Sequence, residues 1–172
     1  DLAKSTQFIQ QITDPKAYAE ALGQLAMVKF PGHPQEAYAY LQSHSRGDWQ
    51  PAALRMLSDV YYNKLGNFDA NAAEILKLDL PRLGPAAATS TSLFCKAWID
   101  NRAPFAVPLS WTLQLPPAVG LNTRLQLAKN KGLKPATAQQ FLAWARTASI
   151  DPAERTQLLN VLSRRLGEMS AR

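Results

Sequence analysis

The sequence predicts an all-α fold in which short antiparallel helix pairs stack into a small α-solenoid closed by a C-terminal capping helix. A faint internal similarity recurs with a step of about 36 residues, and its best pairs, 37 positions apart, are Leu57 with Phe94, Tyr61 with Trp98 and Gly66 with Ala103. A repeat of this size is typical of a helix pair that buries its apolar face by stacking on copies of itself. Apolar residues also recur at helical spacing, and no convincing run of strands is present. An unrelated helical bundle is the alternative architecture.

Proline and glycine divide the first half of the chain into short helices. Asp14 and Pro15 have the character of an N-cap and a first helical residue, where the missing N–H of proline costs nothing. Asp69 is expected to cap a later helix. The predicted helices of this half are 16–29, 35–45, 51–64, 69–78 and 86–101.

The second half is predicted to begin with an irregular, proline-rich connection at 103–121, in which 111–115 forms a short extended segment. Basic helices are then expected at 122–131, from Pro135 onwards and at 152–169. The last helix is the best marked, because Asp151 and Glu154 flank a proline in a capping-box arrangement. The chain is thus a single helical domain, 1–172, with a neutral repeat part (1–102), the connection (103–121) and a basic helical part (122–172).

The net charge of +6 is concentrated in the last third of the chain. Residues 1–121 carry ten Lys or Arg and ten Asp or Glu, whereas residues 122–172 carry nine basic and three acidic residues. A localised positive field attracts anionic partners. Solvated faces of amphipathic helices would produce the same excess without any ligand.

The residues offer little for catalysis, so the protein is expected not to be an enzyme and to need no metal or cofactor. Neither His33 nor His44 has carboxylate or cysteine neighbours at metal-ligand spacing. His44, Ser45 and Asp48 are adjacent in sequence, which does not give the geometry of a catalytic triad. The single cysteine, Cys95, lies in an apolar helical run and is interpreted as a small buried residue rather than a reactive thiol.

No stretch approaches the roughly 20 apolar residues of a transmembrane helix, so no membrane insertion is expected. The N-terminal residues do not resemble a signal peptide. Since the chain starts with Asp1, we interpret it as processed or excised, and its location, a bacterial periplasm or cytoplasm, is left open.

The chain resembles Sel1-like repeats, relatives of the tetratricopeptide repeat, whose units carry alanine, leucine and tyrosine on a first helix, a glycine-containing turn, then an aspartate and an alanine. The residues that follow this pattern in order are Ala53, Leu57, Tyr61, Gly66, Asp69 and Ala73. The match is best in residues 47–77. The small residues Ala53 and Ala73 are expected where the two helices approach closely. The resemblance implies an α-solenoid that binds other proteins.

We therefore expect a protein-binding adaptor of a larger assembly, which docks a partner helix or peptide on its concave face. Tyr38 and Tyr62 fall off the apolar stripes of their helices, and with Trp49 they are the candidate partner contacts. Burial of these tyrosines between stacked repeats is the competing interpretation, and the one we favour.

The alternative function is a module that binds nucleic acid, an acidic protein or an anionic polysaccharide through the basic third. The candidate anion-binding residues are Lys129, Lys131, Lys134, Arg164 and Arg165. A third hypothesis is an enzyme or inhibitor domain whose site lies in residues 103–120.

Overall fold

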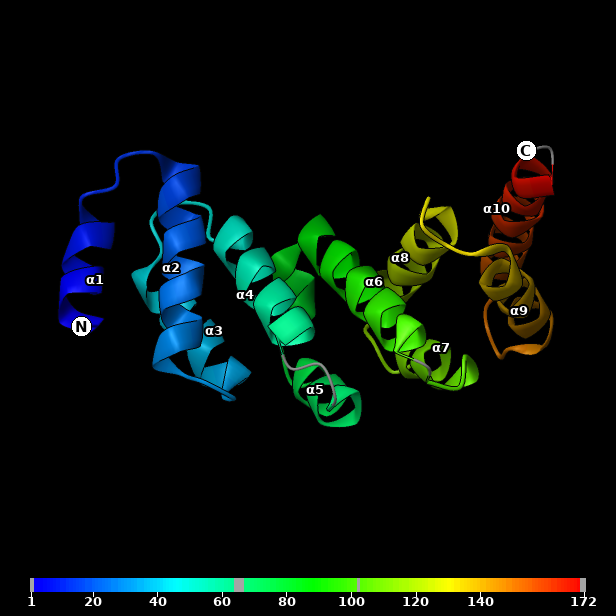
Figure 1. The fold of residues 1–172 in the computed structure, drawn as a ribbon, viewed down its shortest axis with the longest axis horizontal. Helices are drawn as coiled ribbons and strands as arrows, with labels where there is room; N and C mark the ends of the chain where they lie inside the picture. Colours follow the sequence, from blue (N-terminus) through cyan, green and yellow to red (C-terminus); the bar gives the residue numbers. More distant parts are fainter. Residues whose placement is uncertain (1, 64–66, 102, 171–172) are drawn as a thin grey trace. The chain divides into compact units, whose positions relative to one another are not determined.

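The computed structural model describes residues 2–63, 67–101 and 103–170, without the side chains of residues 60–63. This part of the chain forms ten α-helices and one short 3-10 helix and contains no β-strand, so the all-α prediction is confirmed (Figure 1). The elements are α1 (Leu2–Gln10), α2 (Pro15–Lys29), α3 (Pro34–His44), α4 (Gln50–Asn63), α5 (Phe68–Ile75), η1 (Leu80–Leu83), α6 (Pro85–Asp100), α7 (Ala106–Thr112), α8 (Pro117–Lys129), α9 (Pro135–Thr147) and α10 (Pro152–Ser170).

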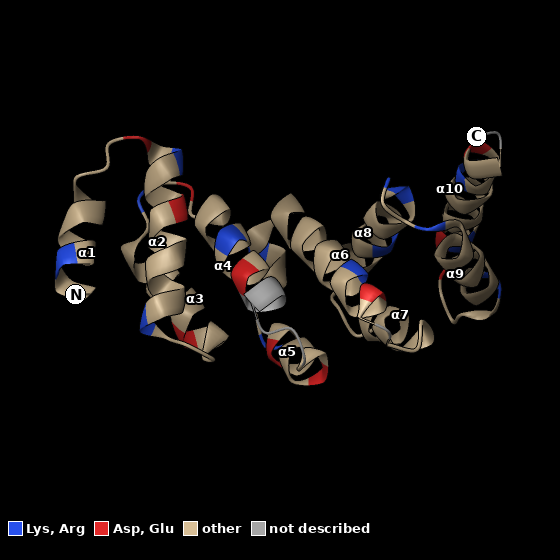
Figure 2. Ribbon diagram, viewed as in Figure 1, with Lys and Arg blue, Asp and Glu red and all other residues tan. Residues whose placement is uncertain are grey.

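The chain divides into two compact units, residues 1–90 (unit 1) and 91–172 (unit 2). The boundary falls inside α6, so unit 1 holds α1 to α5 and η1, and unit 2 holds α7 to α10. Of the nine basic residues in the last third, the eight that the structure describes are carried by α8, α9, α10 and the connections between them (Figure 2). They therefore belong entirely to unit 2.

Helix α2 is central to unit 1 and packs against α1, α3 and α4. It begins as predicted, because Asp14 Oδ1 accepts a hydrogen bond from Ala17 N at 2.7 Å and Pro15 occupies the first turn. Where α2 crosses α4, a Cβ atom at Gly23 would lie only 2.6 Å from Ala52 O. The two helices therefore approach backbone to backbone at this point.

Helix α1 is not predicted from the sequence, which shows no capping signal before residue 14. Its only buried side chain is Ile9. Arg46, in the connection between α3 and α4, donates to Gln10 O at 3.4 Å and also contacts Gln10 Oε1. The same guanidinium lies 4.7 Å from the ring centre of Tyr18. Because these contacts come from a distant part of the chain, the local pattern of residues 2–10 does not indicate them.

Helices α4 and α5 carry the clearest predicted pattern, and the structure corrects two of its details. Ala53 is fully buried, as expected of a small contact residue. Ala73 is exposed, so its interpretation as a helix–helix contact is wrong. The N-cap of α5 is Asn67 rather than Asp69, since Asn67 Oδ1 accepts from a backbone N–H of the first turn at 3.4 Å.

The segment 103–121 is helical for most of its length, so the predicted irregular connection is wrong. It contains α7 and the start of α8. The extended segment predicted at 111–115 is also wrong, because residues 111 and 112 close α7. Pro108 lies in the first turn of α7, and Pro117 is the first residue of α8. Proline in a first helical turn removes no intrahelical hydrogen bond, so these prolines start helices instead of preventing them.

An aromatic cluster joins α6 and α7 within unit 2. The ring centre of Trp111 lies 5.2 Å from that of Phe94 and 6.3 Å from that of Trp98, both in edge-to-face geometry. Cys95 is buried beside them, and its thiol donates to Pro108 O at 3.8 Å. Burial raises the pKa of this thiol well above its ordinary value, and the interpretation of Cys95 as a small buried residue is confirmed.

A buried ion pair connects three helices of unit 2. Arg124 Nε lies 2.5 Å from Glu154 Oε1, and Arg124 Nη2 donates to Glu154 Oε2 at 3.1 Å. Arg124 Nη1 also donates to Thr112 O at 2.9 Å and Thr112 Oγ1 at 3.0 Å. The two charged side chains are only 5% and 9% exposed. Gly120 makes room for this arrangement, because a Cβ there would lie 2.6 Å from Thr112 O.

At the start of α10, only the N-cap of the predicted capping box is formed. Asp151 Oδ1 accepts from Ala153 N at 2.8 Å and from Glu154 N at 3.2 Å, so Asp151 is the N-cap. The carboxylate of Glu154 binds Arg124 through both oxygens, where a capping box would place it on the N-cap N–H. Glu154 is therefore a packing residue of unit 2 rather than a local cap.

Replacing Gly23 by Ala is expected to lower the free energy of unfolding by about 2 kcal/mol, because the new Cβ would displace α4. The loss is expected even though alanine is intrinsically more favourable than glycine inside a helix, by about 1 kcal/mol. Gly167→Ala is the matched control: Gly167 lies in α10 with open space around it, and the variant should be about 0.5–1 kcal/mol more stable. Urea unfolding followed by circular dichroism measures both. Equal effects at the two positions would contradict the close approach of α2 and α4.

Replacing Glu154 by Ala is expected to destabilise the protein by about 3–5 kcal/mol, because it leaves the buried guanidinium of Arg124 without its countercharge. Glu168→Ala, on the same helix, removes a half-exposed carboxylate from its pairs with Arg164 and Arg165 and should cost about 1 kcal/mol. Denaturant unfolding of the two variants provides the comparison. The double variant Arg124→Met with Glu154→Leu should recover most of the loss, and no recovery would show that packing rather than charge is responsible.

Candidate functional site

Tyr38, one of the predicted partner contacts, is part of the core of unit 1. Its side chain is buried, and its hydroxyl donates to Asp79 O at 3.2 Å. Burial raises the pKa of Tyr38, and the nearby Asp79 carboxylate raises it further. The interpretation of this residue as buried is therefore confirmed, and Tyr38 presents no surface to a partner.

Of the other two predicted contacts, only the side chain of Trp49 lies within the described residues. Trp49 is half-buried, and its ring packs edge-on against Tyr38 with ring centres 5.3 Å apart. The side chain of Tyr62 lies outside the described residues, as do the side chain of Tyr61 and all of Gly66. The Trp49 ring therefore packs on Tyr38 and helps to bury it.

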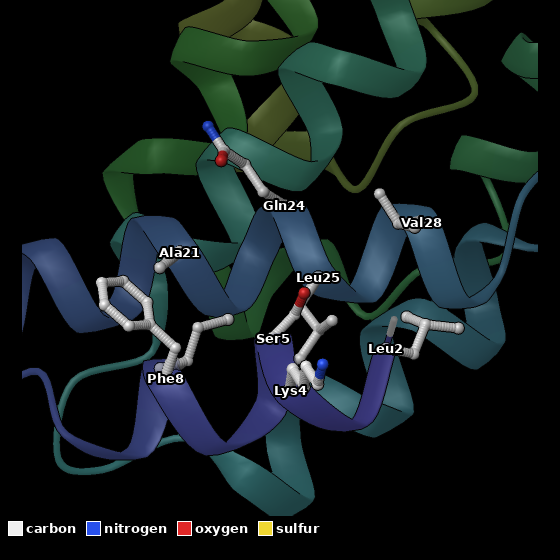
Figure 3. A pocket seen from close by; sticks show the side chains of 9 residues that line it. Leu2, Lys4, Ser5, Phe8, Ala21, Gln24, Leu25 and Val28 are labelled. Carbon is white, nitrogen blue, oxygen red and sulfur yellow. The ribbon is translucent and has the colours of Figure 1, made fainter.

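An open apolar groove of about 600 Å³ lies instead between α1 and α2 (Figure 3). Phe8 and Ala21 stand near one end of it, and Leu2 and Val28 near the other. The residues that line this α1–α2 groove are Leu2, Lys4, Ser5, Phe8, Ile9, Ala21, Gln24, Leu25 and Val28. Lys4 is the only charged residue among them.

The groove is notable for the apolar side chains that it leaves in contact with solvent. Phe8 is 69% exposed, Val28 67% and Leu2 47%. Only two other large apolar side chains of the described residues are exposed, namely Val107 and Leu113 in unit 2. This groove is not predicted from the sequence, because no helix is expected at residues 2–10. The apolar residues at 2, 8 and 9 are the one signal that could have indicated it.

The predicted cationic residues gather around a second, smaller cavity of about 180 Å³ between α8 and α10. The residues that line this α8–α10 cavity are Ala128, Lys129, Lys131, Val161, Arg164, Arg165 and Glu168. Four of the five candidate anion-binding residues are therefore brought together. The fifth, Lys134, is exposed at the start of α9 and does not line the cavity.

Hydrogen bonds anchor Arg165 at this cavity. Its Nη2 donates to Lys131 O at 2.9 Å, and its Nη1 donates to Glu168 Oε2 at 3.3 Å. Its Nε is buried and has no hydrogen-bond partner within the described part of the chain. Arg164 Nε lies 3.9 Å from the other carboxylate oxygen of Glu168, in an exposed pair.

Two of the residues considered for catalysis, His44 and Asp48, make local contacts near helix ends. His44 Nδ1 lies 2.7 Å from Ser43 Oγ and 3.0 Å from Tyr40 O. Asp48 Oδ1 accepts from Gln50 N at 3.0 Å, at the start of α4. Within residues 2–63, 67–101 and 103–170, no three His, Cys, Asp or Glu side chains gather in a way that could hold a metal ion. In the same residues, no helix has both the length and the apolar character needed to cross a membrane.

The chain matches no protein-family model, no curated protein and no solved structure. The resemblance to Sel1-like repeats therefore stays a prediction that rests on residues 47–77.

Replacing Tyr38 by Phe is expected to lower the free energy of unfolding by about 1 kcal/mol at neutral pH, because the hydrogen bond to Asp79 O is lost. The pKa of Tyr38 is higher in the folded protein than in the unfolded chain. The neutral Tyr38 hydroxyl therefore contributes its full stabilisation below the ordinary tyrosine pKa of 10.0, and this contribution is lost as the pH rises through the pKa of the folded state. The variant should therefore lose less stability than the parent protein above about pH 10. Urea unfolding across the alkaline range measures this, and identical alkaline losses would contradict the assignment.

Proposed function

We propose that the protein is a non-enzymatic protein-binding module that holds an apolar segment of a partner in the α1–α2 groove. The observation that carries this proposal is the concentration of exposed apolar side chains. Three of the five large apolar side chains that are exposed in the described residues line this one groove. Apolar surface gathered in a concave site is a common mark of protein interfaces, whereas single exposed apolar residues are not.

The occupant that fits the groove best is a short amphipathic helix with an acidic residue beside its apolar face. Helix α1 has nine residues and is about 13 Å long, so two to three turns of a partner helix would cover it. Phe8 and Val28 would contact the apolar face of that helix. Lys4, the only charged lining residue, would pair with the acidic side chain. Such helix-in-groove binding makes the protein an adaptor between other components of an assembly.

We also propose that the helix pairs are degenerate copies of one Sel1-like or tetratricopeptide-like unit, arranged as an α-solenoid. The spacing of the helices supports this view. Helices α2, α4 and α6 begin at residues 15, 50 and 85, a constant step of 35 residues, and α3 and α5 begin at 34 and 68. A repeat architecture suits an adaptor, because each added pair extends the surface on which partners bind.

The alternative function, binding of nucleic acid or another anionic polymer through the basic third, has weaker support. The buried Arg124 is fully engaged with Glu154 and Thr112, so it is not available to a polymer. Lys96 pairs with Asp100, and Arg155 donates to Ala148 O at 2.8 Å. Four cations of the basic third line the α8–α10 cavity, whose volume of about 180 Å³ suits a smaller anion.

Replacing Val28 by Glu is expected to weaken binding of an amphipathic helical peptide about tenfold or more, because a carboxylate would be buried against the apolar face of the peptide. The probe is a fluorescently labelled 14-residue peptide with leucines on one face and glutamates beside them, and fluorescence anisotropy gives its Kd. The parent protein should bind it in the micromolar range, at roughly −8 kcal/mol. Val107→Glu introduces the same change at an exposed valine of unit 2 and should leave the Kd unchanged.

A second peptide with the same composition in scrambled order tests whether the groove recognises an apolar face. It should bind at least about tenfold more weakly than the amphipathic peptide. Equal binding of the two peptides, or equal weakening by the Val28 and Val107 variants, would refute the groove as the docking site.

A further inference from the structure

We propose that the α8–α10 cavity is a binding site for one phosphate-type oxyanion, either free phosphate or the phosphate group of a small phosphomonoester. This inference goes beyond the protein-binding function, because the cavity belongs to unit 2 and shares no residue with the α1–α2 groove. A cavity of about 180 Å³ has room for one such group and a few waters, since a water occupies about 30 Å³ in the liquid. Ala128 and Val161 form its apolar wall.

Arg165 supplies the donor that makes this cavity a site rather than a charged surface. Its side chain is only 19% exposed, and two hydrogen bonds to Lys131 O and Glu168 hold the guanidinium in place. The remaining Nε is buried and lacks a hydrogen-bond partner in the described residues. The hydrogen bonds to Lys131 O and Glu168 use two of the five N–H donors of the guanidinium, which leaves donors for an oxyanion in the cavity that Arg165 lines. The planar guanidinium fork also suits two oxygens of a tetrahedral phosphate group.

The charges around the cavity favour an anion. Lys129, Lys131, Arg164 and Arg165 carry four positive charges, and Glu168 is the only acidic residue that lines the cavity. Lys129 lies in the last turn of α8, where the helix dipole alone favours a cation, so its charge by itself implies no ligand. Lys131 follows the helix and makes no salt bridge in the part of the chain that the structure describes. Its ammonium group is thus available to a bound oxyanion.

Glu168 limits the site to a compact anion. It pairs with both Arg164 and Arg165, so it lowers the positive charge without removing it. A continuous polyanion would have to pass this carboxylate, and two of the cations beyond the cavity, Arg124 and Lys96, are already paired. A single oxyanion contacts Arg165 and Lys131 and leaves Glu168 on one side. The geometry therefore fits one phosphate group better than a nucleic-acid backbone.

The test is a titration of the ¹⁵N-labelled protein with inorganic phosphate at constant ionic strength, followed by NMR, with sodium chloride as the reference salt. One-to-one saturation with a Kd on the order of 1 mM is expected, with the amide shifts confined to residues near 128–131 and 161–168. A parallel titration with glycerol phosphate separates free phosphate from a phosphomonoester as the better ligand. No saturable shift with either compound would overturn the proposal.

Three variants separate a built site from general attraction between charges. Arg165→Lys keeps the charge but loses the forked N–H donors of the guanidinium, and should weaken phosphate binding about fivefold or more. Glu168→Gln removes the opposing carboxylate and should strengthen binding several-fold. Arg146→Gln removes a positive charge from an exposed residue outside the cavity and should change the Kd by less than about twofold.

Two results would contradict the assignment. If Arg165→Lys binds phosphate as well as the parent protein does, no directed donor exists and only an unspecific positive field remains. If a ten-nucleotide single-stranded DNA binds far more tightly than phosphate, and Arg146→Gln weakens it as much as Arg164→Gln does, the ligand is a nucleic-acid backbone on a wider surface. Retention of the native circular dichroism spectrum in each variant ensures that the comparison concerns folded protein.

Discussion

Unit 2 depends on the buried ion pair between Arg124 and Glu154. Removing two charges from water costs several kcal/mol per ion, and this cost is offset only where the groups find well-placed partners. Here the guanidinium binds both carboxylate oxygens and also Thr112. Because Thr112 ends α7 whereas the charged partners belong to α8 and α10, one side chain fixes three helices. Arg165 follows Glu154 by eleven residues, about three helical turns along the same face of α10, so the pair also positions α10 against the end of α8. The α8–α10 cavity is a consequence of that packing.

Helix starts are the part of the fold that the sequence predicts best, since caps and first-turn prolines act locally. Helices α2, α3, α9 and α10 each begin within one residue of the predicted start. Proline also produces the wrong prediction at 103–121. The high density of prolines there predicts an irregular chain, although Pro108 and Pro117 both lie in the first turns of helices. Helix α1 is missed for the opposite reason. The contact that holds its end comes from Arg46, 36 residues away from Gln10, and no local pattern encodes such a contact.

The candidate sites are less predictable than the helices, because periodicity identifies the apolar side of a helix but not what covers it. Tyr38 lies off the predicted stripe of α3, yet Trp49 and Asp79 O provide it with a buried environment. Phe8 and Val28 show the converse, since neighbouring helices leave them largely exposed. For the cations, the sequence reveals the excess of charge in the last third. Only the packing of α10 on α8 shows which of these residues share a cavity.

The two proposed sites rely on interactions that respond differently to solution conditions. Association at the α1–α2 groove buries apolar side chains, which salt does not screen. Anion binding at the α8–α10 cavity depends on charges, and at about 0.1 M ionic strength these are screened beyond about 10 Å. The sites also lie in different compact units, so each can be formed without residues of the other. An adaptor built in this way would hold its protein partner over a wide range of salt concentrations, while its affinity for the anion would rise as the ionic strength falls.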